Sequence, residues 1–285
     1  MKATATDRRS GRRTIVGLAR ACHLQPTVAV TAATTALALL AGQRMPGALA
    51  VAAAVLAGQC SVGWSNDWFD AGRDDATGQT QKPIVAGLVS AATVRNAALI
   101  ALAASVPLSL LLGWQATGVH LIAIGSAWAY NGRLKATAWS PLPYAISFGL
   151  LPAFITLGLP SHPWPRANVM IATALLGTGV HFINTLGDRD ADHATGITGL
   201  PQRMTATGAL SVGITLLSFA ALLVWSLGDR LKMMQNALVL LALGLDVIVL
   251  LSVRAERPER AQTWALASAG VCLVLFAVSR PMLTN

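Results

Sequence analysis

Two short stretches of the sequence carry oxygen-bearing side chains at every fourth position. They are Asn66, Asp70 and Asp74 in the stretch NDWFDAGRDDATG, and Asn184, Asp188 and Asp192 in the stretch NTLGDRDADHATG. Four residues turn a helix by about 400°, so side chains at this spacing form a stripe along one face. Carboxylate and amide oxygens suit hard divalent cations, above all Mg²⁺. The pattern therefore predicts that each stretch is one half of a magnesium site, whereas Asp75 lies off the stripe and is expected to be solvated.

The two stretches align with each other at an offset of 118 residues. Beyond the stripe, the matching pairs are Thr77 with Thr195, Gly78 with Gly196, and Pro83 with Pro201. This similarity indicates an internal duplication in which each half contributes one polar rim. Matching polar signatures also occur in the two halves of transporters, so the repeat alone does not identify an enzyme. Stacked carboxylates at a helix C-terminus repel one another, so we expect bound cations rather than simple polar caps.

Cationic side chains accompany the acidic stretches, as the binding of a diphosphate would require. Arg73 lies within the first stretch and Lys82 in the loop after it, while a third joint, YNGRLKATAWSPLPY, adds Tyr130, Arg133 and Lys135. Mg²⁺ usually shares its coordination shell between a few carboxylates and the oxygens of a phosphate substrate. Two opposed acidic clusters would hold Mg²⁺ with a diphosphate between them, which would neutralise the charge of the leaving group. The alternative explanation for Arg133 and Lys135 is that cytoplasmic loops of membrane proteins are generally rich in basic residues.

These residues must be held by a membrane-embedded helical scaffold. The chain of 285 residues is 54% hydrophobic and 12% charged, with a mean hydropathy of +0.57, whereas soluble proteins are about 25% charged. Apolar blocks of roughly transmembrane length lie near 27–42, 47–64, 93–113, 117–130, 142–160, 167–184, 206–227, 234–252 and 262–279. We predict an all-α polytopic membrane bundle of about nine transmembrane helices in two related halves, forming a single domain over residues 1–285.

The 21 basic residues are distributed unevenly between the predicted loops. With a cytoplasmic N-terminus, sixteen Lys and Arg residues fall on the cytoplasmic side and five on the other. The positive-inside rule therefore places the basic N-terminal segment 1–22 and both acidic stretches at the cytoplasmic face of the cell membrane. The formal net charge of +9 does not indicate a nucleic-acid partner, because the sequence offers no solvated basic face.

A few further polar residues are weaker candidates. His181 lies three residues before Asn184 and could orient an acceptor or act as a base, although a helix–helix contact is the alternative. Arg20 and His23, ahead of the first apolar block, could meet an acidic acceptor, or they could anchor the chain at the membrane interface. Asp246 lies inside an apolar block, where an ionisable residue usually marks function or a buried partner. No partner for it is evident in the sequence, so we leave it outside the predicted site.

The motifs resemble those of the UbiA superfamily of membrane prenyltransferases. NDWFDAGRD fits the NDxxDxxxD signature of that family, which adds Asp67 to the set, and DRDAD resembles its second motif, DxxxD. QKPIVAG is similar to the family's basic-Pro-x-x-x-Gly loop, and Tyr130 to Lys135 resemble its tyrosine-then-lysine motif. The resemblance covers roughly residues 15–280. Thr185 is a departure, since the family's second motif often has an acidic residue there.

The resemblance implies Mg²⁺-dependent transfer of an isoprenyl group from an isoprenyl diphosphate to an acceptor, usually an aromatic one. The implied metal ligands are Asn66, Asp67, Asp70, Asp74, Asn184, Asp188 and Asp192, with the catalytic roles on Asp70, Asp74, Asp188 and Asp192. Ionisation would leave an allylic cation, which the faces of Trp64, Trp128 or Phe182 could stabilise.

Alternatives remain open at this level. The superfamily serves quinone-precursor aromatics, phosphorylated sugars, glycerol phosphates and haem-like rings, and the motifs do not select among these acceptors. A terpene cyclase on the same scaffold would ionise the same donor but quench the cation within the substrate. A non-catalytic transporter or lipid-binding membrane protein would keep the polar helix ends without any turnover.

Overall fold

The computed structural model describes residues 5–187, 189–227, 232–255 and 257–278, and every regular element in these ranges is a helix. The longer elements are α1 (Ala5–Ala21), α2 (Leu24–Leu40), α3 (Met45–Ala76), α4 (Ala91–Leu110), α5 (Trp114–Gly132), α6 (Pro141–Gly149), α7 (Leu151–Leu157), α8 (Ala167–Asn184), α10 (Ala206–Ser226), α11 (Lys232–Arg254) and α12 (Pro258–Val278). The short helix α9 (Arg189–Ala194) and the 3₁₀ turns η1 (Leu134–Ala136) and η2 (Pro201–Arg203) lie in the connections. The prediction of an all-α bundle is confirmed.

Five of the described helices are long and apolar enough to cross a membrane: α3, α4, α8, α10 and α11. Helix α2, the pair α6 and α7, and most of α12 are apolar but shorter. Each of the nine apolar blocks coincides with helix in the structure. The number of nine membrane spans is nevertheless not confirmed for the described residues, because several of these helices are too short or, like α5, too polar to meet the same criterion.

The block near 142–160 forms two short helices instead of one. Helix α6 ends at Gly149, and α7 starts at Leu151 with Pro152 in its first turn. Proline has no N–H to donate to the carbonyl four residues earlier, and its ring clashes with that carbonyl, so a helix that reached Pro152 would break one turn before it. The backbone N–H of Phe154 then bonds the carbonyl of Leu150 at 2.9 Å, which begins a new helix.

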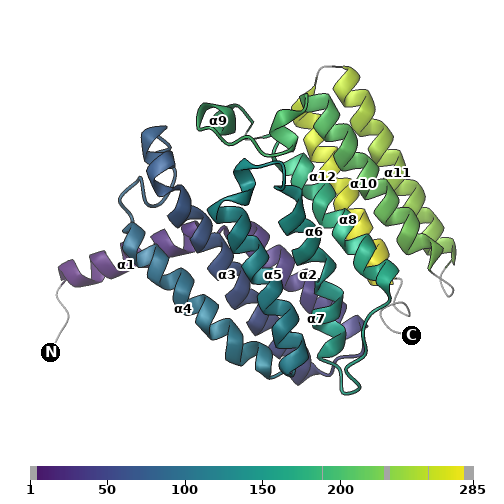
Figure 1. The fold of residues 1–285 in the computed structure, drawn as a ribbon, viewed down its shortest axis with the longest axis horizontal. Coiled ribbons are helices and arrows are strands. Elements are labelled where there is room, and N and C mark those ends of the chain that lie inside the picture. The colour runs from purple at the N-terminus through teal and green to yellow at the C-terminus, as the bar shows by residue number, and fades with distance from the viewer. Residues whose placement is uncertain (1–4, 188, 228–231, 256, 279–285) are drawn as a thin grey trace.

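The helices pack in two neighbouring groups that α6 joins (Figure 1). One buried apolar cluster draws on α2, α3, α5 and α7, and the other on α8, α10, α11 and α12. In the second group α8 crosses α10 with their backbones in close contact, because a Cβ atom at Gly179 would lie 2.9 Å from the carbonyl oxygen of Gly213. Contacts between small residues of this kind drive helix association in lipid, where apolar side chains gain little by leaving the bilayer.

An elbow between α1 and α2 rests on the polar part of α3. A Cβ atom at Gly63 would lie 2.7 Å from the carbonyl carbon of Cys22, so this close approach requires glycine. The indole N–H of Trp64 donates to the carbonyl of Leu18 at 2.8 Å and fixes the end of α1. His23, at the elbow, has the left-handed backbone conformation, with φ of 53°. This arrangement turns its side chain toward α3, one helical turn beyond Gly63.

Candidate functional site

The acidic residues of α3 lie at its C-terminal end and are buried. Asp67, Asp70 and Asp74 have relative exposures of 2%, 6% and 3%, whereas Asp75 is exposed. Asp67 was predicted only from the resemblance to the family signature, but positions 67, 70 and 74 also share one face, because residues three, four and seven apart lie together on a helix. The structure therefore brings together all three aspartates of the first signature.

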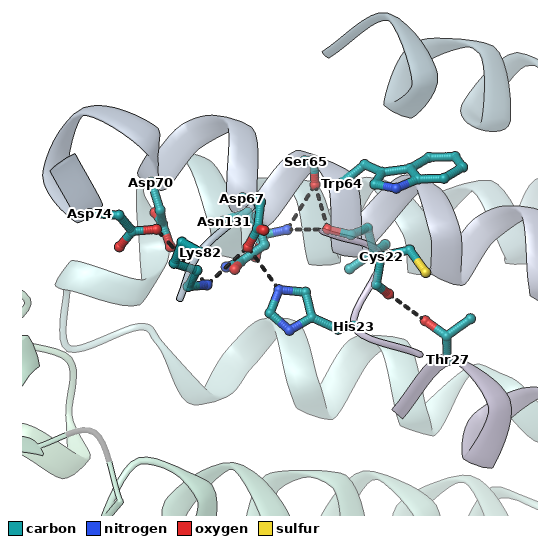
Figure 2. A network of polar contacts seen from close by, with 12 residues as sticks. Cys22, His23, Thr27, Trp64, Ser65, Asp67, Asp70, Asp74, Lys82 and Asn131 are labelled. Carbon is teal, nitrogen blue, oxygen red and sulfur yellow. Dashed lines mark hydrogen bonds and ion pairs between the residues drawn. The ribbon is translucent and has the colours of Figure 1, made fainter. Parts of the chain in front are cut away.

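Basic side chains compensate these buried carboxylates. Lys82 lies with Nζ 2.9 Å from Oδ1 of Asp67 and 3.9 Å from Oδ2 of Asp74. The same Oδ1 atom of Asp67 is 3.0 Å from Nε2 of His23, and Figure 2 shows both side chains reaching this carboxylate. Their convergence leaves Asp67 paired from two different segments of the chain, the elbow and the loop after α3.

Asp70 is paired from a third segment. A guanidinium nitrogen of Arg73, one turn along α3, lies 2.7 Å from Oδ2 of Asp70, and Nζ of Lys135 in η1 contacts Oδ1. Lys135 is itself largely buried, and this burial lowers its pKa because it disfavours the charged ammonium, while the neighbouring Asp70 carboxylate acts in the opposite direction. Lys135 thus lies where the sequence analysis expected it, whereas Arg133, its companion in the same joint, is exposed.

The second acidic stretch differs from its prediction. A continuous stripe over Asn184, Asp188 and Asp192 is wrong, because α8 ends at Asn184 and the separate helix α9 begins at Arg189. The intervening Thr185 and Gly187 favour helix poorly, which accounts for the break. Asn184 is exposed, Asp192 is half-buried, and Asp188 lies outside the described residues. Asp192 accepts a hydrogen bond from the side-chain amide of Gln202 at 2.8 Å, which ties α9 to η2.

The two acidic stretches nevertheless end in the same turn. After α3 the N–H of Gly78 bonds the carbonyl of Asp75, and the N–H of Gln79 bonds that of Asp74. At positions 118 residues later, the N–H of Gly196 bonds the carbonyl of His193, and that of Ile197 bonds Asp192. Both glycines have left-handed φ, 65° and 74°, which closes the helix and turns the chain back toward the site.

An amide network that the sequence analysis missed fixes Asn66. The side-chain amide of Asn66 donates to Oδ1 of Asn131 at 3.3 Å, and the amide of buried Asn131 donates to the carbonyl of Val62 and to Oγ of Ser65, at 2.9 and 2.8 Å. These contacts hold the end of α5 against α3 (Figure 2). Asn131 directly follows Tyr130 in the third polar joint, and its place in that joint was the available signal.

An aromatic cluster lies between α5, α6 and α8. The ring of Tyr130 meets those of Tyr144 and His181 edge-on, with centroids 5.1 and 5.6 Å apart, and Tyr144 stacks on His181 at 4.5 Å. Tyr130 also lies within electrostatic range of both Asp70 and Asp192. The aromatic cluster therefore lies between the two acidic stretches.

The other aromatic candidates have different positions. Phe182 is buried beside His181, with ring centroids 5.9 Å apart, and so borders the cluster. Trp128 donates to Oγ of Ser61 at 3.0 Å, and Trp64 belongs to the elbow, so both serve helix packing at α3. Asp246 is buried on α11 with Ser218 as its hydrogen-bond donor, apart from the acidic residues of α3.

A cavity of about 460 Å³ lies where the elbow meets the loop after α3. Its polar lining is Arg20, His23, Asp67, Gln81 and Lys82. Three of these side chains are basic, so an anionic group is the complement of this cavity. His181, the other residue expected to meet an acceptor, lies away from it, buried against Oγ of Ser140 at 3.2 Å.

The donors at the ends of α3 and α9 fit Mg²⁺ by their chemistry. They are carboxylate and amide oxygens, and three carboxylates are buried on one face of α3. In the described part of the chain, no three His, Cys, Asp or Glu side chains converge closely enough to enclose a metal by themselves. This arrangement suits a cation that completes its shell with substrate oxygens, as Mg²⁺ does in phosphate-binding sites.

The fold and this site define a helical membrane protein that gathers buried carboxylates and cations at one end of its bundle. The chain belongs to the UbiA prenyltransferase family, whose model matches residues 23–278. In sequence comparison, no curated protein matches the chain.

Solved structures share the fold at low sequence identity. A structure described as digeranylgeranylglyceryl phosphate synthase in membranes aligns with a TM-score of 0.70 and 15% identity, over 93% of this chain and 98% of that one. An apo UbiA homologue from Aeropyrum pernix K1 gives 0.67 and 19%, over 89% and 98%. A UbiA homologue from Archaeoglobus fulgidus, bound to GPP and Mg²⁺, gives 0.66 and 13%, over 91% and 99%.

Proposed function

We propose that the protein transfers an isoprenyl group from an isoprenyl diphosphate to an acceptor at the cytoplasmic face of the cell membrane, with Mg²⁺ as cofactor. One observation carries this proposal: the buried carboxylates of α3 are paired with lysines from two separate loops, Lys82 and Lys135. When a substrate binds, its diphosphate can pair with the two lysines in place of the carboxylates, and the carboxylates can then bind a cation. The Mg²⁺ and GPP bound to the homologue from Archaeoglobus fulgidus support the same assignment.

In this proposal the acidic residues share the metal-binding role. They are Asn66, Asp67, Asp70 and Asp74 on α3, and Asn184, Asp188 and Asp192 on the second stretch. The chemistry that Mg²⁺ supplies when bound is neutralisation of the diphosphate charge, which makes it a better leaving group. Asp70 and Asp74, with Asp188 and Asp192, are the residues on which we expect turnover to depend.

The remaining steps fall to other side chains. Lys82, Arg73, Lys135 and Arg133 bind the diphosphate oxygens, and the Tyr130 hydroxyl can donate to one of them. As the carbon–oxygen bond breaks, the electron pair leaves with the diphosphate, and the allylic carbon becomes cationic. The rings of Tyr130 and Tyr144 then present π-faces to that cation. An acceptor nucleophile forms the new bond, and its proton is lost to complete the transfer.

The elbow cavity supports transfer to a separate acceptor. Arg20 and His23 line it beside Asp67, so we propose that an acceptor bearing a carboxylate or phosphate enters here. His181 serves the reaction as part of the aromatic cluster, because its ring stacks on that of Tyr144. A cyclase would need no such second pocket, and we therefore treat cyclisation as an outcome to be tested.

The test uses purified protein with Mg²⁺ and isoprenyl diphosphates, with and without a set of aromatic and phosphorylated acceptors, and identifies products by mass spectrometry. Diphosphate release that requires an acceptor supports transfer, and a terpene product without acceptor indicates a cyclase. Asp70→Asn should abolish turnover, while Asp75→Asn, which removes an exposed carboxylate from the same helix, should not. If no donor is turned over and Asp70→Asn leaves Mg²⁺-dependent donor binding unchanged, the enzyme assignment is wrong.

A further inference from the structure

The aromatic cluster continues into the bundle as a column of three rings. Tyr144 stacks on His181, and Phe148 is nearly parallel to Tyr144, with an interplanar angle of 9° and centroids 6.3 Å apart. Tyr144 and Phe148 are four residues apart on α6, so they lie on one face of that helix. Phe148 is the ring furthest along this column from Tyr130 and the acidic residues.

Phe148 occupies this position because α8 has no side chain opposite it. A Cβ atom at Gly177 would lie 2.6 Å from Cδ2 of Phe148, closer than real side chains approach. Gly177 and His181 are also four residues apart, so α8 offers a ring to Tyr144 and bare backbone to Phe148. The position of the Phe148 ring is thus determined by the glycine.

Beyond Phe148 lies an apolar cavity of about 120 Å³ between α2, α6, α7, α8 and α12. Its lining includes Val30, Leu37, Phe148, Leu176, Leu273 and Phe276. Two threonines also line it, but their hydroxyls are bonded within their own helices: Thr34 donates to Val30 and Thr173 to Val169 and Met170. The cavity therefore offers no free polar partner and suits a hydrocarbon.

We propose that Phe148, which packs against the bare backbone of Gly177, sets the length of the isoprenyl chain that the protein accepts. This proposal rests on the proposed function. A donor whose diphosphate lies at Lys82 and Lys135 would extend its tail past Tyr144, and Phe148 stands between that path and the apolar cavity. A cavity of about 150 Å³ holds one benzene molecule, so 120 Å³ corresponds to about one five-carbon isoprene unit. The Phe148 ring removes a similar volume from the path.

Two variants should shift the chain-length preference in opposite directions. Phe148→Ala joins the path to the cavity and should favour donors longer by about one isoprene unit. Gly177→Ala places a Cβ against both Cβ and the ring of Phe148, so this residue must move away from α8. We expect this shift to narrow the path of the tail and to favour shorter donors. Because one methylene in a hydrophobic pocket changes discrimination by about 10- to 200-fold, we expect the ratio of kcat/KM between neighbouring donor lengths to change at least tenfold.

The measurement is kcat/KM for donors of five, ten, fifteen and twenty carbons with each variant, expressed as ratios within that variant so that differences in folded fraction cancel. The controls are Phe219→Ala, which truncates a lipid-exposed phenylalanine of α10, and Gly244→Ala in α11, where an added Cβ meets no atom within 4 Å. Both should retain the wild-type ratios. Phe148→Leu serves as a milder truncation if the alanine variant does not fold.

The outcomes separate the two proposals. Opposite shifts in Phe148→Ala and Gly177→Ala support Phe148 as the residue that limits chain length. Unchanged ratios in active variants, or shifts in the same direction, overturn this inference and leave the proposed function intact. No turnover of any donor by the wild-type protein would instead contradict the proposed function itself.

Discussion

The ion pair between Lys135 and Asp70 could serve only the stability of the fold, or its two residues could bind separate ligands during turnover. A double substitution distinguishes these two roles. In the free protein the two side chains neutralise each other, both largely buried. During turnover we expect them to separate, with Lys135 binding the diphosphate and Asp70 binding Mg²⁺. If the ion pair serves only stability, removing both charges should restore the stability and the activity that each single variant loses. If the two residues bind different ligands, the double variant should regain stability but not activity.

The magnitudes follow from the surroundings of Asp70. Breaking a buried ion pair costs about 3–5 kcal/mol when one charge is left alone, but Arg73 also pairs with Asp70 at 2.7 Å. We therefore expect Lys135→Met to lower the free energy of unfolding by about 1–3 kcal/mol. A lost hydrogen bond to a charged group costs a similar 1.5–3 kcal/mol in the transition state, so kcat/KM for the donor should fall about 10- to 150-fold.

The decisive variant is the double substitution Asp70→Asn with Lys135→Met. Thermal unfolding in detergent micelles should return toward the wild-type value, since both buried charges of the pair are removed and Arg73, which loses Asp70 as its partner, is partly exposed. Donor turnover, followed by diphosphate release, should stay at or below that of the weaker single variant. Recovery of activity together with stability would refute the reasoning, because it would show that the pair acts only as a structural ion pair.

The charge of Lys135, the contact at Gly63 and the choice of metal can each be tested separately. Burial lowers the pKa of Lys135, so its charge is lost as the pH rises through a value below that of an ordinary lysine. KM for the donor, measured from initial rates over a pH series, should therefore rise at alkaline pH. Lys135→Arg should flatten this rise, because arginine keeps its charge. Gly63→Ala should displace the elbow, because its Cβ would lie 2.7 Å from the carbonyl carbon of Cys22; we expect an increase in acceptor KM with little change in donor KM, and no effect of Gly72→Ala, where a Cβ meets no atom within 4 Å. EDTA should abolish turnover, and Mg²⁺ should restore it better than Zn²⁺, since the candidate ligands are oxygens; equal recovery with Zn²⁺ would contradict the oxygen-ligand assignment.

Residues on a single helix were predictable from the sequence. The spacing of Asp70 and Asp74 was enough to place them together, because helix geometry alone decides which residues share a face. The same rule could have added Asp67, which lies three residues before Asp70. The approach of Lys135 to the acidic stretches was expected from topology and charge, since both were assigned to the cytoplasmic face, but its ion pair with Asp70 was not.

Features that depend on two helices at once were not predictable. The column of Tyr144 and Phe148 against His181 and Gly177 requires the register between α6 and α8, which no local pattern encodes. The break of the second stripe after Asn184 depends on a balance between weak helix formers and tertiary contacts. The close approach of the elbow to Gly63 could be recognised only once α1 was placed against α3.

The elbow has a consequence for how specificity in this protein can be altered. The match to the family ends at residue 23 on the N-terminal side, yet α1 contributes Arg20 to the cavity beside Asp67. The wall that we assign to the acceptor is therefore supplied in part by a segment ahead of the shared core, whereas the acidic residues belong to that core. A chimaera that exchanges residues 5–22 for those of a relative would change the acceptor wall while every metal-binding candidate stays in place, and an affinity tag is better attached at the other end of the chain.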